Sequence, residues 1–274
     1  MRFVVTVLLW IVTTAALLVA VPAQWLQHNV VDIDGYAALA ESAAHDPQLQ
    51  DAMASELSTQ VVQVADVDRD SVKPIAAAYT SSQWFPGQFA QVNRIGHRWL
   101  FSDAVSQSGD QLVVDLQPLL TDTSFQQTLE DNSIDVPTTV TVPVTATGGV
   151  RPGQLRPLAT WGPWVSLGAT VVAVIAALLM LVAARRRGKA LAALGISVLL
   201  VGGAGWASAE VLRSYVSDGL KNTTGDVRRM ADVMVATAEG SLHHWLNLTL
   251  AAGAGLVVLG VIVASLGSLR ANEH

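Results

Sequence analysis

Four long apolar stretches, separated by polar segments, dominate the pattern of this chain. Residues 165–184 and 190–209 each form a run of 20 residues without an ionisable side chain. At a helical rise of 1.5 Å per residue, such a run spans about 30 Å, the thickness of the hydrocarbon core of a bilayer. Residues 3–23 and 246–269 are similarly apolar. The pattern predicts an integral membrane protein, mainly α, with four transmembrane helices.

The five residues 185–189, between the second and third runs, fix the expected orientation. They hold four cations, Arg185, Arg186, Arg187 and Lys189. Basic loops lie on the cytoplasmic side of bacterial membranes. We therefore expect a multi-pass protein of the plasma membrane with a cytoplasmic loop at 185–189 and a cytoplasmic tail at 270–274. Both termini are then cytoplasmic, and residues 24–160 and 210–245 lie outside the cell.

Tryptophan positions agree with this orientation. An indole ring favours the membrane interface, where its N–H can stay hydrated. Five of the eight tryptophans fall at the expected outer ends of the spans: Trp25, Trp161, Trp164, Trp206 and Trp245.

The first apolar run has two interpretations. Val21-Pro22-Ala23 resembles the small-residue site at which a secretory signal peptide is cleaved. The run itself is 21 residues long, which exceeds a signal-peptide core and is enough to cross the bilayer. We favour an uncleaved signal-anchor over residues 1–23.

Composition narrows the functional classes. Cysteine is absent, so disulfides, thiolate nucleophiles and cysteine metal sites are excluded. Residues 24–160 carry sixteen Asp or Glu against six Lys or Arg, and the whole chain has a net charge of −6. Because nucleic-acid binding needs a basic surface, we expect no nucleic-acid partner.

The expected spans lack charged residues but are rich in small ones. Ion and proton pathways depend on intramembrane charge, so its absence argues against a pump, channel or transporter. Small residues four positions apart allow helices to pack closely. We favour packing among the protein's own spans over a partner interface for these pairs, which are Ala193 with Ser197, Gly203 with Ala207, Ala251 with Gly255, and Gly260 with Ala264.

The segment 24–160 is long enough for one extracytoplasmic domain. Asp34 is expected to cap a helix that ends near Ala44, and Asp46-Pro47 to begin another. The apolar stripe of the second helix comprises Leu49, Ala52, Met53, Leu57 and Val61. Residues 119–130 fit a further helix, and residues 111–116 and 138–144 alternate as strands. The prediction is an α+β, mostly helical domain.

Residues 210–245 continue the third and fourth spans beyond the membrane. Lys221 to Gly225 form a turn signal, and Val227, Met230 and Met234 give the returning segment an apolar side. We expect a helical hairpin that packs against the larger outer domain.

Several motifs carry a family resemblance over most of the chain. They are Val31-Asp32-Ile33-Asp34-Gly35-Tyr36, Asp46-Pro47-Gln48-Leu49-Gln50-Asp51-Ala52, Leu112-Val113-Val114-Asp115-Leu116, the arginine run after the second span and the final helical pair. With these features the chain resembles a family of actinobacterial integral membrane proteins of uncharacterised function. The resemblance implies four spans and one large outer domain, and it implies no reaction. Residues 75–107 depart most from the family pattern.

The carboxylate run at Asp66, Asp68 and Asp70 resembles the start of a calcium loop. An EF-hand needs Gly at the sixth position and Glu at the twelfth. Ser71 and Ala77 occupy those positions. The run therefore favours an acidic turn between helices. Asp32 and Asp34 have no neighbouring nucleophile in the sequence, and a capping role is favoured over catalysis.

The histidines give no clear ligand set. His243 and His244 point about 100° apart on a helix, so they cannot bind one metal from one face, and we favour an interfacial role beside Trp245. His28 and His97 have no evident companions in the sequence. Nucleophile-elbow, P-loop and dinucleotide-binding motifs are absent. We expect a protein that is not an enzyme and needs no cofactor or metal.

An aromatic stretch has the greatest functional interest: Trp84, Phe85, Phe89, Trp99 and Phe101. Core packing is the favoured interpretation, and a surface for a hydrophobic ligand or partner is the alternative. Two functions follow. The first is an accessory or scaffold subunit of an envelope complex, with protein partners and membrane lipids around it. The alternative is a lipid or hydrophobic-ligand binding protein that assists envelope lipid transport.

Overall fold

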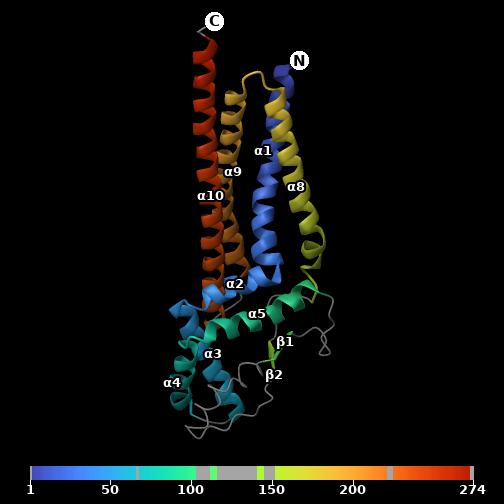
Figure 1. Cartoon of the computed structure of the whole chain (residues 1–274). Coiled ribbons are helices and arrows are strands. Elements are labelled where there is room, and N and C mark those ends of the chain that lie inside the picture. The colour runs from blue at the N-terminus through green and yellow to red at the C-terminus, as the bar shows by residue number, and fades with distance from the viewer. Residues whose placement is uncertain are drawn as a thin grey trace. The chain divides into compact units, whose positions relative to one another are not determined.

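The computed structural model of the chain describes residues 2–65, 68–102, 112–115, 141–144, 152–220 and 225–271. The chain forms two compact units. The first unit, which we call the membrane unit, comprises Met1–Gln27, Thr160–Tyr215 and Glu239–His274. The second comprises His28–Ala159 and Val216–Ala238, and we call it the outer unit after the location that the sequence predicts for it. Figure 1 traces the elements of both along the chain.

Among the described residues, four helices are long and apolar enough to cross a membrane, at the places where the sequence predicts the four spans. They are α1 (Arg2–Leu26), α8 (Arg156–Ala183), α9 (Arg187–Gly219) and α10 (Gly225–Ala271). Their apolar side chains are largely exposed, and a window of 18 residues in α1 or α10 is only 11% buried. Exposure on that scale is what hydrocarbon, rather than water, tolerates.

The helices are longer than the apolar runs, because polar ends extend them. α9 begins at Arg187, so the break between α8 and α9 is narrower than the expected loop 185–189. α1 leads into a π-helical turn, η1 (Gln27–Val31). α9 and α10 both run past their apolar runs, as expected for segment 210–245.

The outer unit contains α2 (Ile33–Ala43), α3 (Pro47–Ala65), α4 (Arg69–Thr80) and α5 (Phe85–Phe101). The expected cap of α2 was wrong by two residues. Asp32, in extended conformation, accepts hydrogen bonds from the backbone N–H groups of Asp34 and Gly35 at 3.0 and 2.9 Å. Asp34 lies inside the first turn, where its carboxylate pairs with Arg94 of α5.

One apolar core joins the helices of the outer unit. The stripe predicted for α3 is confirmed, because Leu49, Ala52, Leu57 and Val61 are at most 5% exposed. The returning part of α10 joins this core through Val233, which is buried. Further members of the core come from α2, α4 and α5, including Ala40, Val72, Ile75, Tyr79, Phe85 and Phe89.

Two short strands, β1 (Leu112–Asp115) and β2 (Thr141–Val144), form an antiparallel pair in which Leu112 faces Val144 and Asp115 faces Thr141. They lie within the two segments that alternate as strands in the sequence. A ribbon of two four-residue strands is too small to build a sheet layer. The expected α+β class is therefore corrected to mainly α for the part of the domain that the structure describes. The helix expected over 119–130 lies outside the described residues.

Candidate functional site

Neutral polar contacts join the helices of the membrane unit. The Trp10 indole N–H donates to the carbonyl of Ala193 at 3.0 Å, and the Thr14 hydroxyl donates to the Ser197 hydroxyl at 2.8 Å. These bonds join α1 to α9. Gln24 joins α1 to α8 through the Thr170 hydroxyl at 3.2 Å. Each contact satisfies a polar group that hydrocarbon could not solvate.

α9 and α10 approach so closely that their backbones touch at glycines. A Cβ added to Gly188 would lie 2.4 Å from the backbone nitrogen of Ala264, and one added to Gly260 would lie 2.4 Å from that of Ala192. At Gly195 the nearest atom would be the backbone nitrogen of Val257, at 2.6 Å. The pair Gly260 and Ala264 therefore packs within the protein, as we expected.

Two of the predicted small-residue pairs lie on exposed sides of α9 and α10 and not at the contact between these helices. A Cβ added to Gly203 or Gly255 meets nothing within 4 Å, and both residues are exposed. Ala207 and Ala251, their partners at four-residue spacing, are exposed as well. We call these two exposed pairs together, one on each helix, the open small-residue face. The helices that the structure describes leave this face uncovered.

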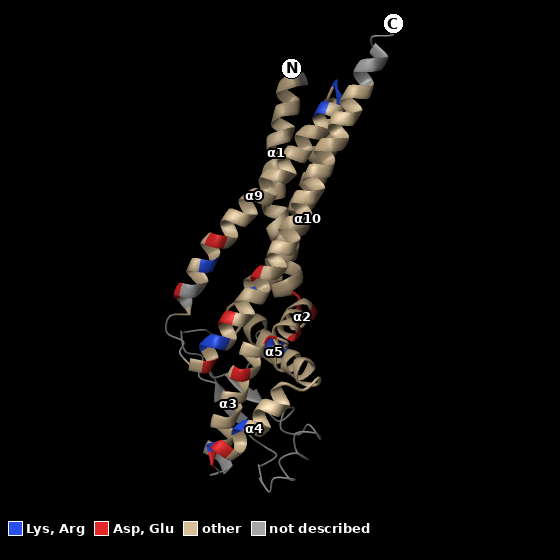
Figure 2. Ribbon diagram, turned by 90° about the vertical axis from the view of Figure 1, so that its left-hand side faces the viewer, with Lys and Arg blue, Asp and Glu red and all other residues tan. Residues whose placement is uncertain are grey.

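Charge is confined to the ends of the membrane helices. In Figure 2 the long middle portions of α1, α9 and α10 carry neither blue nor red. The cations of residues 185–189 are all exposed: Arg185 and Arg186 lie between α8 and α9, and Arg187 and Lys189 lie in the first turn of α9. Arg213 and Glu239 form an ion pair at 3.7 Å further along α9 and α10.

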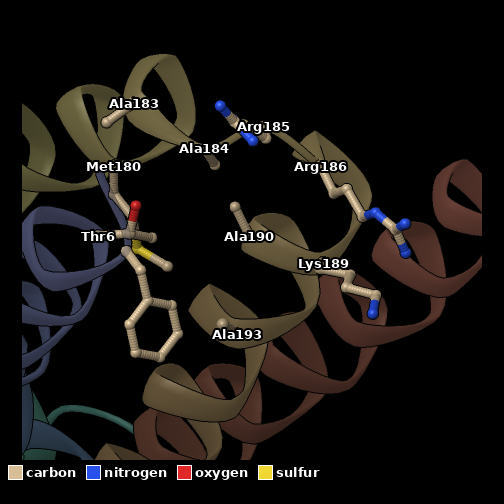
Figure 3. A pocket seen from close by; sticks show the side chains of 10 residues that line it. Thr6, Met180, Ala183, Ala184, Arg185, Arg186, Lys189, Ala190 and Ala193 are labelled. Atoms are coloured by element: carbon tan, nitrogen blue, oxygen red, sulfur yellow. The ribbon is translucent and has the colours of Figure 1, made fainter. Parts of the chain in front are cut away.

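Three of these cations border a cavity of about 740 Å³ between the ends of α1, α8 and α9. Its lining combines Arg185, Arg186 and Lys189 with apolar residues, and Arg187 does not take part. Figure 3 shows Ala184 and Ala190 facing the space from one side, with Met180 and Thr6 on the other.

The five residues of the aromatic stretch divide between the core and the surface of the outer unit. Phe85, Phe89 and Trp99 are at most 6% exposed, and Phe85 and Phe89 belong to the outer core. Phe101 is half-buried, and Trp84 is 60% exposed. The five side chains therefore do not line one surface, and their burial supports core packing.

A cluster that the sequence did not reveal surrounds His97 in the outer unit. The His97 ring is buried and stacks on Phe101 with centroids 4.2 Å apart, while Tyr36 lies against it at 5.2 Å. The His97 Nε2 atom lies 3.0 Å from the carbonyl oxygen of Val30, which fixes a donor role for this nitrogen. The signal for the stacked pair is its four-residue spacing on a helix.

Tyr36 ties this cluster to the rest of the α2–α5 contact. Its hydroxyl lies 3.4 Å from the Asn93 side-chain oxygen, at the long end of a hydrogen bond. Burial raises the pKa of the Tyr36 hydroxyl above its ordinary value. Since the ion pair of Asp34 with Arg94 lies between the same two helices, we interpret the cluster as structural support for their packing.

The other predicted polar residues lie apart from one another. His243 stacks on the Trp206 indole at 3.9 Å, and the Trp206 N–H donates to Asn247 at 3.3 Å, whereas His244 is exposed. Asp68 is the residue that precedes α4, in the turn after α3, and Asp66 lies outside the described residues. Among the residues with described positions, no group of three or more metal-ligating side chains comes together.

Comparisons of the chain with protein-family models, with curated proteins and with solved structures found no match.

Proposed function

We propose that the chain is a non-enzymatic integral membrane protein of the bacterial cell envelope that serves as a scaffold or accessory subunit of a larger complex. The observation that carries this proposal is the division of its small residues. One set brings α9 and α10 into backbone contact, and the other forms the open small-residue face. Small residues favour close helix association, and in the second set this capacity is unused within the chain.

The chemistry of the membrane helices supports a structural role. Their interhelical bonds join neutral groups, such as the Trp10 indole with a carbonyl and Thr14 with Ser197. Transport of ions or protons uses titratable groups within the membrane. The apolar runs of this sequence contain none. A bundle without titratable groups in its apolar runs is suited to a structural role and not to the transport of charge.

The proposed orientation places residues 185–189 and both termini in the cytoplasm, with residues 24–160 and 210–245 outside. The basic turn supports it through the positive-inside rule. Trp161 and Trp164 also support it, because these residues are 67% and 71% exposed near the start of α8, as expected of interfacial anchors. Membership of the actinobacterial family remains a prediction from the sequence motifs.

The partner interface can be tested with a matched pair of glycine variants. Gly203 and Gly168, on α9 and α8, are both exposed and have open space at the Cβ position. Tagged chains carrying Gly203→Leu or Gly168→Leu would be cross-linked in the native membrane and compared with the unaltered chain. We expect one defined cross-linked assembly, lost in Gly203→Leu and retained in Gly168→Leu.

Two results would contradict the proposal. The first is a strictly monomeric unaltered chain, without cross-linked partners, after extraction in mild detergent. The second is an assembly that persists undiminished in Gly203→Leu. A thermal unfolding scan of each variant shows that a lost assembly does not come from a misfolded chain.

A further inference from the structure

The cavity at the α8–α9 turn combines cationic and apolar residues in a way that the scaffold role does not explain. We propose that it is a binding site for a glycerophospholipid with an anionic headgroup. The phosphate would sit at the mouth beside Arg185, Arg186 and Lys189, and an acyl chain would occupy the apolar interior. The inference depends on the membrane location of the four helices and not on the proposed partner.

Charge complementarity is the first argument. Of the ten residues that line the cavity, three are cations and none is an Asp or Glu. In the described part of the chain, the ion pairs are formed by other residues and do not involve these three cations. Basic pockets between transmembrane helices on the cytoplasmic side bind anionic lipid headgroups. The charges of Arg185, Arg186 and Lys189 are thus available to an external anion.

The lining also contains two kinds of residue, as suits an amphiphile: cations and apolar side chains. Figure 3 shows Arg186, just before α9, and Lys189, in its first turn, with side chains that extend away from the space that Ala184 and Ala190 face, and Arg185 over the α8–α9 turn. The cationic ends therefore lie at the rim of the cavity and not inside it. The buried residues Met180 and Ala190 supply apolar surface to the cavity, and the largely exposed Phe3 also lines it. A free phosphate would bind only the cations and leave the apolar surface exposed. A phospholipid would bind the cations through its headgroup and cover the apolar surface with an acyl chain.

The volume agrees with an acyl chain segment. About 740 Å³ is within the range of small-molecule sites, and it is far more than one phosphate needs. The site lies at the end of the bundle that carries the arginine run. Under the proposed orientation, the lipid therefore comes from the inner leaflet.

Adjacent arginines provide a matched test. Arg186 lines the cavity and Arg187 does not, although both are exposed and adjacent, Arg186 just before α9 and Arg187 as its first residue. The full-length chain, purified in mild detergent, would be incubated with equal amounts of phosphatidylglycerol and phosphatidylcholine. Native mass spectrometry would then measure the ratio of the two lipids retained. A parallel sample would contain inorganic phosphate as a competitor.

We expect the unaltered chain to retain phosphatidylglycerol preferentially. Arg186→Gln should lower that preference roughly fivefold, and Arg186→Gln with Lys189→Gln roughly 25-fold, because each cation near an anionic headgroup contributes a factor of this size. Arg187→Gln should leave the preference within about twofold. Ala184→Phe, which fills the interior, should reduce retention of both lipids.

Three results would overturn the proposal. Equal retention of the two lipids by the unaltered chain would remove headgroup selectivity. An equal effect of Arg187→Gln and Arg186→Gln would show a diffuse surface attraction instead of a site. Displacement of phosphatidylglycerol by millimolar inorganic phosphate would identify a simple anion site. The substituted cations are exposed, so their replacement is not expected to unfold the chain. A melting curve of each variant checks that a lost lipid preference does not come from misfolding.

Discussion

The indole N–H of Trp10 donates a hydrogen bond to the backbone carbonyl of Ala193, 183 positions away in the sequence. One turn further along both helices, Thr14 bonds Ser197. Since the residue numbers rise together on α1 and α9, the two helices run in the same direction. First and third spans must do so if each helix crosses the membrane once. The contact therefore supports alternating crossings by the first three spans.

Removing the Trp10 hydrogen bond should weaken the bundle modestly. Trp10→Phe keeps an aromatic ring and deletes the donor, and Thr14→Val deletes the second bond. Interhelical hydrogen bonds in membranes contribute about 0.6 kcal/mol on average, so we expect a loss of about 0.5–1.5 kcal/mol for each variant. Unfolding in mixed micelles measures it. An unchanged unfolding free energy for both variants would contradict the assigned contacts.

Adding a methyl group at the α9–α10 contact should be far more costly than adding one on the open face. In Gly195→Ala the new Cβ would lie 2.6 Å from a backbone nitrogen, and in Gly260→Ala 2.4 Å. Backbone atoms cannot rotate away, so the helices must separate, at a cost of about 1–3 kcal/mol. Gly203→Ala is the control, with a change within about 0.5 kcal/mol. Thermal unfolding in lipid nanodiscs distinguishes them.

Gly35 should be intolerant of any side chain. A Cβ at this position would lie 1.7 Å from the carbonyl oxygen of His28, because the chain turns sharply between η1 and α2. Gly35→Ala should lower the stability of the outer unit by more than about 2 kcal/mol, through forced backbone movement. Gly96→Ala, in the open middle of α5, should be neutral or stabilising by about 0.5–1 kcal/mol. Limited proteolysis of the full chain reports both, and equal protease resistance of the two variants would contradict the tight turn.

The buried Tyr36 predicts a loss of stability at alkaline pH. Its pKa is raised in the folded chain, so the folded state holds the hydroxyl proton more tightly than the unfolded state. Stability is then unaffected below pH 10.0, the ordinary pKa, and falls as the pH rises above it. Tyr36→Phe should make that fall shallower. Unfolding midpoints from pH 8 to about 11.5 test it, and identical slopes for the two chains would contradict the prediction.

The sequence predicted the four spans well because a membrane helix follows from length and hydropathy alone. The α3 stripe was also readable, since Leu49, Leu57 and Val61 repeat at helical spacing. The cap of α2 was placed at Asp34 rather than Asp32, because two carboxylates two residues apart offer the same local signal. Only the backbone conformation at Asp32 separates them.

Contacts between segments that lie far apart in the sequence could not be predicted in the same way. His97 had no companion in sequence, yet Tyr36 and Val30 reach it from segments about 60 residues earlier. The α9–α10 contact left a clearer trace, because Gly188, Gly195 and Gly202 recur every seven residues, as do Gly253 and Gly260. The cavity depends on the relative positions of three helices, which no local pattern specifies.

The orientation of the helices is the claim on which the proposed function and the source of the lipid both depend. The chain has no cysteine, so single-cysteine variants report topology without background. Arg187→Cys and Gln83→Cys, both at exposed positions, would be treated in intact cells with a maleimide that cannot cross the membrane. We predict labelling at position 83 in intact cells and at position 187 only after the membrane is opened. Labelling at position 187 in intact cells would contradict the account.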